Sequence, residues 1–319
     1  MDTLAIIIPG YNCEKDIEKC LRSILTQAHL DYTIFFIDDG STDDTKNIVK
    51  NIKNKHVKYI YQNNSGVSVA RNKGLVNAKN FEYIMFVDAD DWFEDGAFNI
   101  IEQTIQDSKR ADYILFDWNE YYIEKNIRKR KECKMNGDFS CKTEIEDIKN
   151  HLLRSRSGGS PWARLFKNKI IEENDINFIE GLPYAEDYLF NLTFLKNAQT
   201  VYYNPVPIYA YNCFESGARA KFRKNLVDIL IIIESEKKKL FFNDFHKYEM
   251  LIMSELLEQV TIALRNLTHQ EFSSRERKIE KRKIKKFLNE WNVSIKYILK
   301  MEVNIKIKLY LILFLLRII

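Results

Sequence analysis

The chain has 319 residues, of which 45% are hydrophobic, 13% aromatic and 29% charged, with only 10 glycines and 5 prolines. This aromatic content excludes a wholly disordered protein, and the scarcity of glycine and proline excludes collagen-like and low-complexity architectures. The length allows one large domain with a satellite, or two domains, around a sizeable core. The net charge of +4 is uneven, because the residues from Ser273 onward carry 13 Lys or Arg and 4 Glu, a net +9 that leaves −5 for the first 272 residues.

Strands and helices alternate through the first part of the chain. Short aliphatic or aromatic runs predict buried strands at 4–8, 33–37, 57–61, 83–87 and 112–116. The segments between them have helical spacing and predict helices at 14–27, 43–54, 66–78 and 94–107. We therefore expect an α/β fold with a Rossmann-type, mainly parallel sheet covered by helices on both faces. Such sheets bind ligands at the carboxyl ends of their strands.

The later segments are less regular. Residues 121–139 are polar, basic and aromatic and predict a hairpin or an excursion from the sheet. A helix is expected at 186–197, one or two short strands at 201–211, and helices from about residue 222 to the end.

The acidic group Asp88-Ala89-Asp90-Asp91 follows the fourth predicted strand directly. Carboxylates this close repel one another, and their desolvation is costly unless a cation or hydrogen-bond donors compensate. Mg²⁺ and Mn²⁺ prefer such oxygen ligands and usually share them with substrate phosphates. The alternative is a solvated acidic turn before the helix that begins near Glu94.

Two further polar groups end the first and second strands. Asp38-Asp39 can accept hydrogen bonds from a base or a ribose, as acidic residues do in other doubly wound sheets, or can simply cap the next helix. Pro9-Gly10-Tyr11-Asn12 offers an aromatic face for a base, or a turn with a packing tyrosine.

Taken together and in order, these motifs resemble glycosyltransferase family 2, the inverting nucleotide-sugar transferases of the GT-A fold. The resemblance covers about residues 3–217 and continues through Ala70-Arg71-Asn72, Pro161-Trp162-Ala163-Arg164 and Tyr184-Ala185-Glu186-Asp187. It implies a donor-binding half at 1–110, an acceptor-binding half with the catalytic base at 111–217, and a helical C-terminal region at 218–319.

The resemblance also implies roles for donor-site residues. Pro9 and Tyr11 would line the uracil site of a UDP-sugar, and Asp39 would bind the uracil or its ribose. Arg71 would add positive charge to the nucleotide pocket, although a helix-face ion pair explains it as well. Asp88 would touch the ribose.

The metal and the base follow from the same resemblance. Asp90 would bind the Mn²⁺ or Mg²⁺ ion that bridges the donor's phosphates, with Asp88 and Asp91 as further ligands, because the register of this motif varies by one position. Asp187, with Glu186 beside it, would take the proton from the acceptor hydroxyl. The alternative for both is that acidic residues favour a helix N-terminus.

Two aromatic residues of the second half are candidates for stacking on acceptor sugar rings. Trp162 and Tyr184 belong to the motifs of the resemblance, and either can equally be part of the core.

The basic C-terminal region suggests a partner surface. Basic residues concentrate in 273–287, and an apolar run at 309–316 is too short for the ~20 residues of a membrane-spanning helix. Basic and apolar segments together suit adsorption to an anionic inner leaflet. The alternatives are a homo-oligomer contact and simple packing. No nucleic-acid-binding motif is present, and we expect no nucleic-acid partner.

The location follows from the two ends and the cysteines. No basic segment or small-residue cleavage site precedes the first strand, so we expect no signal peptide. Five cysteines without a CxxC pair indicate free thiols. The expected location is the cytoplasm, at the inner face of the cell membrane.

The predicted function is metal-dependent transfer of a hexosyl or N-acetylhexosaminyl group from a UDP-sugar to a hydroxyl of a glycan, plausibly lipid-linked, in capsule or other cell-surface polysaccharide synthesis. A nucleotide-sugar pyrophosphorylase is the enzymatic alternative, but Pro9-Gly10-Tyr11-Asn12 replaces its glycine- and arginine-rich loop. No G-x-G-x-x-G motif follows a strand, which disfavours a dinucleotide oxidoreductase. The non-enzymatic alternative is an inactive, membrane-docked partner of another transferase.

Overall fold

A computed structural model describes most of the chain. The described residues are 3–27, 31–124, 127–133, 140, 143–154, 159–213, 222–301 and 303–316. They divide into two compact units, Met1–Lys149 with Ser157–Glu215, and Asn150–Arg156 with Ser216–Ile319. Cys13, Cys20 and Cys213 carry free thiols, as expected, whereas Cys141 and the side chain of Cys133 lie outside what the structure describes.

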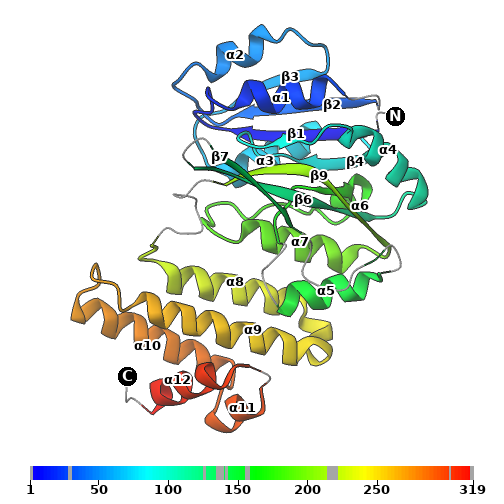
Figure 1. Cartoon of the computed structure of the whole chain (residues 1–319). Helices are drawn as coiled ribbons and strands as arrows, with labels where there is room; N and C mark the ends of the chain where they lie inside the picture. The colour runs from blue at the N-terminus through cyan, green and yellow to red at the C-terminus, as the bar shows by residue number, and fades with distance from the viewer. Residues whose placement is uncertain are drawn as a thin grey trace. The chain divides into compact units, whose positions relative to one another are not determined.

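The first unit contains one sheet, whose strands lie side by side in Figure 1. Within the described residues its order is β3-β2-β1-β4-β8-β6-β9-β5, and β7 pairs with β6. Strands β1, β2, β3 and β4 pair in parallel, as the alternating pattern predicts. The strands are β1 (Leu4–Gly10), β2 (Tyr32–Asp38), β3 (Val57–Tyr61), β4 (Tyr83–Phe86), β5 (Trp92–Phe93), β6 (Tyr113–Glu124), β7 (Ile127–Cys133), β8 (Arg164–Lys167) and β9 (Val201–Cys213).

The second half of the sheet mixes directions. β8 lies antiparallel between β4 and β6, β6 runs parallel to β9, and β5 pairs antiparallel with β9. β7 pairs antiparallel with the end of β6, in agreement with a hairpin as one of the two alternatives for 121–139, of which 125–126 and 134–139 lie outside the described residues. The sheet is therefore parallel where the nucleotide motifs lie and mixed beyond them.

Helices cover both faces of this sheet, so that β1 is buried on both sides. Leu4, Ile6 and Ile8 belong to the core cluster with residues of α1 and α4, while Ile7 on the opposite face meets α3. The helices that precede the C-terminal region are α1 (Ile17–Leu25), α2 (Thr45–Asn51), α3 (Val67–Asn77), α4 (Ala97–Asp107), α5 (Ile145–Arg154), α6 (Asn168–Glu173) and α7 (Glu186–Asn197).

The second unit is helical in its described residues, as predicted. Helix α10 begins with a capping box, in which the side chains of Ser273 and Glu276 satisfy each other's backbone N–H groups. The helices are α8 (Leu226–Leu240), the short 3₁₀ helix η2 (Phe242–Asp244), α9 (Phe245–Asn266), α10 (Ser274–Glu290), α11 (Ile295–Lys300) and α12 (Ile305–Leu315).

A buried ionic triad joins α8 to α9. Lys237 is 0% exposed and its Nζ lies 2.7 Å from an Oε atom of Glu234 on the same helix. The same ammonium pairs with Glu255 of α9, which is also buried. Such a triad contributes little net stability, but removing one partner leaves buried charge uncompensated.

Candidate active site

The carboxyl ends of three parallel strands bring the predicted nucleotide motifs to one edge of the sheet. Gly10 at the end of β1 is in register with Asp38 at the end of β2, and β4 lies on the other side of β1. The segments that begin at Tyr11, Asp39 and Asp88 therefore leave the sheet next to one another, as the sequence predicts.

The first loop presents an aromatic ring to solvent. Pro9 is buried in β1, whereas Tyr11 is 51% exposed. The next residue, Asn12, binds the second loop: its N–H donates to Ser41 Oγ over 2.9 Å, and its Oδ1 accepts from Thr42 N–H over 2.8 Å. The turn that carries Tyr11 is thus fixed while the ring itself is open to a ligand.

Asp39 is 5% exposed and organises the loop before α3. Its carboxylate accepts hydrogen bonds from Gln62 Nε2 over 2.7 Å, from Ser65 N–H over 2.8 Å and from Gly66 N–H over 2.9 Å. A nucleotide that binds Asp39 would share oxygen atoms that already hold this loop.

The three carboxylates after β4 have different surroundings. Asp91 is 1% exposed, and its two oxygens accept from Tyr209 Oη over 2.6 Å and from Asn212 N–H over 2.8 Å. Asp88 and Asp90 are half-buried. Burial, with the charge of Asp88, raises the pKa of Asp90 to about 6. These contacts favour Asp88 and Asp90 over Asp91 as metal ligands.

The donor set at this turn fits a divalent cation that binds together with phosphates. Asp88 and Asp90 offer carboxylate oxygens, and no Lys or Arg of the described residues pairs with Asp90. No three His, Cys, Asp or Glu side chains of the described ranges converge as a closed metal site. Mg²⁺ commonly binds through one or two carboxylates plus substrate phosphates, which is the arrangement these residues allow.

Arg71 links the acidic turn to the predicted base. Its side chain is buried, and its Nη2 lies 3.0 Å from Asp88 Oδ1. Its Nη1 lies 3.4 Å from Glu186 Oε1 and also pairs with Asp187. One guanidinium therefore holds three carboxylates from two distant parts of the sequence, so that Arg71 faces the candidate base as well as the donor motif.

Arg71 reaches these carboxylates because α3 lies very close to β1. Gly74 stands one turn after Arg71, and a Cβ atom there would lie 2.3 Å from Ile7 Cγ2. No side chain fits in that space, so glycine permits the close approach.

Asp187 lies in the first turn of α7, after a strained residue. Ala185, the N-cap, has a φ of 63°, in the left-handed region that non-glycine residues rarely adopt. Burial raises the pKa of Asp187 to about 8; Arg71 opposes this rise, and Glu186 adds to it. A carboxylate with a pKa in this range suits a general base.

Sequence reasoning missed Tyr209. Its Oη accepts from Asp88 N–H over 3.1 Å and donates to Asp91 Oδ2, so this buried hydroxyl fixes the acidic turn. The alternation of Tyr209 and Tyr211 indicates a strand with one aromatic face, but it does not show which segment the Tyr209 hydroxyl contacts.

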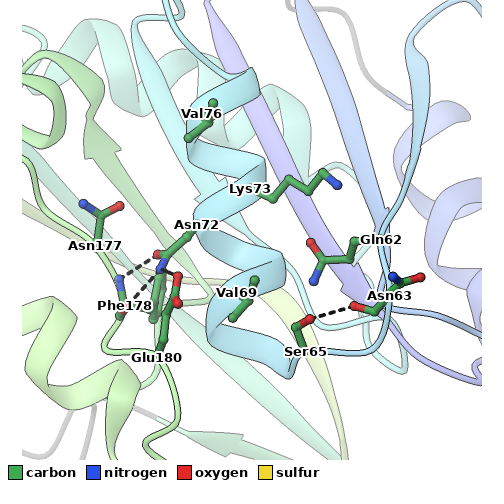
Figure 2. A pocket seen from close by; sticks show the side chains of 10 residues that line it. All are labelled: Gln62, Asn63, Ser65, Val69, Asn72, Lys73, Val76, Asn177, Phe178 and Glu180. Atoms are coloured by element: carbon green, nitrogen blue, oxygen red, sulfur yellow. Dashed lines mark hydrogen bonds between the residues drawn. The ribbon is translucent and has the colours of Figure 1, made fainter.

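A pocket of about 760 Å³ lies beside α3 (Figure 2). The residues of α3 that line it recur at helical spacing on a face that does not include Arg71. None of the predicted site residues lines it, but it borders them: Gln62 and Ser65 hydrogen-bond Asp39, and the Phe178 ring centroid lies 5.1 Å from Arg71 Cζ. Its lining residues are Gln62, Asn63, Ser65, Val69, Asn72, Lys73, Val76, Asn177, Phe178 and Glu180.

Comparison with solved structures shows the class of fold. A crystal structure of S. aureus TarS residues 1–349 in complex with UDP-GlcNAc matches with a TM-score of 0.73 and 21% identity, over 94% of this chain and 84% of that one. The fold is therefore the expected GT-A-like α/β fold followed by helices.

The sequence comparisons show the family. Residues 5–174 match Glycosyl transferase family 2, and the chain belongs to this family. "Glycosyltransferase GlyA" of Streptococcus pneumoniae is 28% identical over 81% of this chain and 37% of its own length. "Uncharacterized glycosyltransferase EpsJ" of Bacillus subtilis is 27% identical over 65% of this chain and 60% of its own length. The chain thus spans less than two thirds of these two relatives.

Proposed function

We propose that the protein is an inverting glycosyltransferase that moves a hexosyl or N-acetylhexosaminyl group from a UDP-sugar to a hydroxyl of a glycan. The family and the Arg71 cluster support this assignment over a pyrophosphorylase or an inactive partner. UDP-GlcNAc is the first donor to test, because it is bound in the similar TarS structure. "Poly(ribitol-phosphate) beta-N-acetylglucosaminyltransferase TarP" of S. aureus, 28% identical over 70% of this chain, likewise supports an N-acetylglucosaminyl donor.

The donor would bind at the edge that β1, β2 and β4 form. In this proposal the exposed ring of Tyr11 stacks on the uracil beside Pro9, and Asp39 contacts the base or ribose. Asp88 would contact the ribose, and Asp90, with Asp88 as a further ligand, would bind a Mn²⁺ or Mg²⁺ ion. When bound, that ion supplies positive charge to the leaving diphosphate.

Asp187 would act on the acceptor. Inverting transfer is a single displacement, in which the acceptor oxygen forms a bond to the anomeric carbon as the bond to the diphosphate breaks. Asp187 accepts the hydroxyl proton during this step, for a gain of about 10²–10⁴ in rate. Arg71 holds the carboxylate in place, and Glu186 beside it keeps its proton affinity high.

The observation that carries the proposal is the buried guanidinium that joins the donor turn to the carboxylates of Glu186 and Asp187. Asp187→Asn should keep UDP affinity in calorimetry and lose transfer from the best donor in a screen of UDP-Glc, UDP-Gal, UDP-GlcNAc and UDP-GalNAc with Mn²⁺. Asp107→Asn, on the exposed end of α4, is the matched control. Substantial transfer by Asp187→Asn would place the base elsewhere.

We also propose that residues 1–110 bind the donor, 111–217 bind the acceptor, and 218–319 contact an anionic membrane surface at the inner face of the cell membrane. Within the described ranges, no helix combines the length and hydropathy that crossing a membrane requires. In this proposal the contact is peripheral and brings the enzyme to a lipid-linked acceptor.

An exposed apolar stripe on α12 supports this surface. Ile305 is 74% exposed, Leu309 59% and Leu316 55%, and their spacing places them on one side of the helix and its C-cap. Lys306 is also exposed on this helix. Exposed apolar side chains next to a basic one suit contact with an anionic bilayer.

Helix α10 adds a basic stripe. Arg275, Lys278, Arg282 and Lys286 are exposed and recur at helical spacing. Each basic residue near an anionic bilayer contributes about 1 kcal/mol.

Flotation with phosphatidylglycerol vesicles tests the membrane proposal. A double variant, Ile305→Ser with Leu309→Ser, should lose most vesicle binding, whereas Phe242→Ser, which changes the exposed side chain of η2, should not. If the double variant changes the oligomeric state in ultracentrifugation and leaves flotation intact, α12 is a contact between copies of the chain instead.

A further inference from the structure

Four aromatic rings gather where β6 and β9 run in parallel. Trp162, just before β8, stacks on Tyr209 at 5.0 Å and 2° and on Tyr211 at 5.3 Å and 20°. Trp118 of β6 meets Trp162 edge-on, with a centroid distance of 5.2 Å and an angle of 74°. The register that pairs Trp118 with Tyr209 brings these rings to one face of the sheet.

Burial divides the cluster into a foundation and a surface. Tyr209 is 0% exposed and Trp162 is 6% exposed, so Trp162, which the sequence suggested for sugar stacking, belongs to the core. Trp118 and Tyr211 pack against that core and remain half-buried. The ring area that a ligand can reach therefore belongs to residues that the sequence did not single out.

The cluster is connected to both parts of the candidate active site. The hydroxyl of Tyr209 accepts the backbone N–H of Asp88 over 3.1 Å. On α7, Asn191 Nδ2 donates to the backbone oxygen of Gly159 over 2.8 Å and to that of Asp187 over 2.9 Å. The segment that carries Trp162 is thus hydrogen-bonded to α7, the helix of the candidate base. Tyr209, on the other side of the cluster, is hydrogen-bonded to the donor turn at Asp88.

The backbone beside Trp162 is strained. Ala163 has a φ of 55°, in the left-handed region, at a cost of about 1 kcal/mol or more for a residue with a Cβ atom. Residues held in this conformation concentrate at functional sites, where the surroundings enforce an orientation. Here the enforced orientation is that of the Trp162 indole, which contacts the rings of Trp118 and Tyr211.

A carboxylate accompanies the rings. Glu120 is in register with Tyr211, and strand alternation places it on the same face as Trp118. Tyr122 Oη donates to Glu120 Oε2 over 2.7 Å. Aromatic faces suit the C–H side of a pyranose ring, and Glu120, which is only 9% exposed, holds the Tyr122 hydroxyl beside these rings.

We propose that Trp118 and Tyr211 form a subsite for a pyranose ring of the acceptor. The inference rests on the proposed transfer function, and it names the chemistry of the acceptor: a pyranose with one face free for stacking. The rings that would bind it are connected by hydrogen bonds to the donor turn at Asp88 and to the helix that carries Asp187.

Saturation-transfer NMR with the full chain tests the subsite. The probes are the methyl β-glycosides of Glc, Gal, GlcNAc and GalNAc at millimolar concentration, with and without UDP and Mn²⁺. Trp118→Leu and Tyr211→Leu should each weaken binding of the best probe by about threefold to tenfold, the range expected for the loss of one aromatic contact. Trp118→Phe, which keeps a ring, should recover part of the affinity.

Tyr61→Ala, which removes a ring that is 53% exposed at the edge strand β3, should leave glycoside binding unchanged. Circular dichroism melts confirm that each variant folds. No binding by the wild type, or equal binding by wild type and both Leu variants, would overturn the subsite. UDP affinity, measured by calorimetry on the same samples, tests the proposed transfer function separately. A protein that does not bind UDP would count against donor binding, but not against the stacking surface.

Discussion

Replacing Arg71 by methionine should destabilise the first unit. The substitution keeps the apolar stem but removes the guanidinium from three carboxylates, and Arg71 is only 3% exposed. Removing one partner of a buried ion pair costs about 3–5 kcal/mol. Asp88 and Asp187 keep 30% and 28% of their side-chain surface exposed, so water relieves part of the repulsion. At pH 9, where the Asp187 carboxyl is ionised as well, we therefore expect the lower end, about 3 kcal/mol, or about 6–12 °C in Tm for a unit of this size.

Urea unfolding followed by tryptophan fluorescence measures this change, because three of the four tryptophans lie in the first unit. The matched control is Arg22→Met, which breaks the 2.7 Å pair with Glu18 on the exposed surface of α1. An exposed pair of this kind contributes at most about 1 kcal/mol. If the two variants lose the same free energy of unfolding, the cluster around Arg71 contributes no net stability and the reasoning fails.

The same variant has a kinetic signature. Arg71 lowers the pKa of Asp187 against the effect of burial, so its removal should raise that pKa further. The pH at which transfer reaches half its maximum should then move upward in Arg71→Met and stay unchanged in Arg22→Met. An identical profile in both would show that Asp187 does not titrate with the reaction.

Three further outcomes follow. Chelation with EDTA, or Asp90→Asn, should weaken UDP binding at least about tenfold in calorimetry, as expected when a metal contact to the diphosphate is lost. Because the pKa of Asp90 is raised to about 6, UDP affinity in the presence of the metal should rise between pH 5 and 7. A flat profile would count against Asp90 as a ligand. In the folded state Asp187 keeps a proton that the unfolded chain releases above about pH 4. Between pH 4 and its folded pKa of about 8, the rate of transfer should therefore rise with pH while the free energy of unfolding falls. If pH-rate and urea measurements show both changing in the same direction, this reasoning is contradicted. Ala185→Gly relieves a left-handed φ and should leave the free energy of unfolding unchanged or raise it by up to about 1 kcal/mol, whereas a clear loss of stability would refute the strain at this N-cap.

The parallel half of the sheet could be predicted from sequence because each of its strands is a short apolar run that ends at a turn signal. The strand predicted at 57–61 coincides with β3, and the helix predicted at 186–197 coincides with α7. The pairing of β6 with β9 could not be predicted, because it joins segments more than 80 residues apart that contain no register signal of their own.

The candidate site divides in the same way. Motif order placed Tyr11, Asp39 and Asp88 at one sheet edge, since the ends of parallel strands must meet there. It did not show that Arg71 reaches Asp187, because that contact depends on how closely a helix approaches a strand. The roles of these residues in binding and transfer remain predictions.

Gly74 limits which substitutions the fold tolerates. Its missing side chain lets α3 lie against Ile7 at a distance that no larger residue permits. In a random mutagenesis library with Ile7 unchanged, position 74 should therefore tolerate no other residue. Homologues that carry a larger residue there would need a smaller one at position 7, so the two positions should vary together.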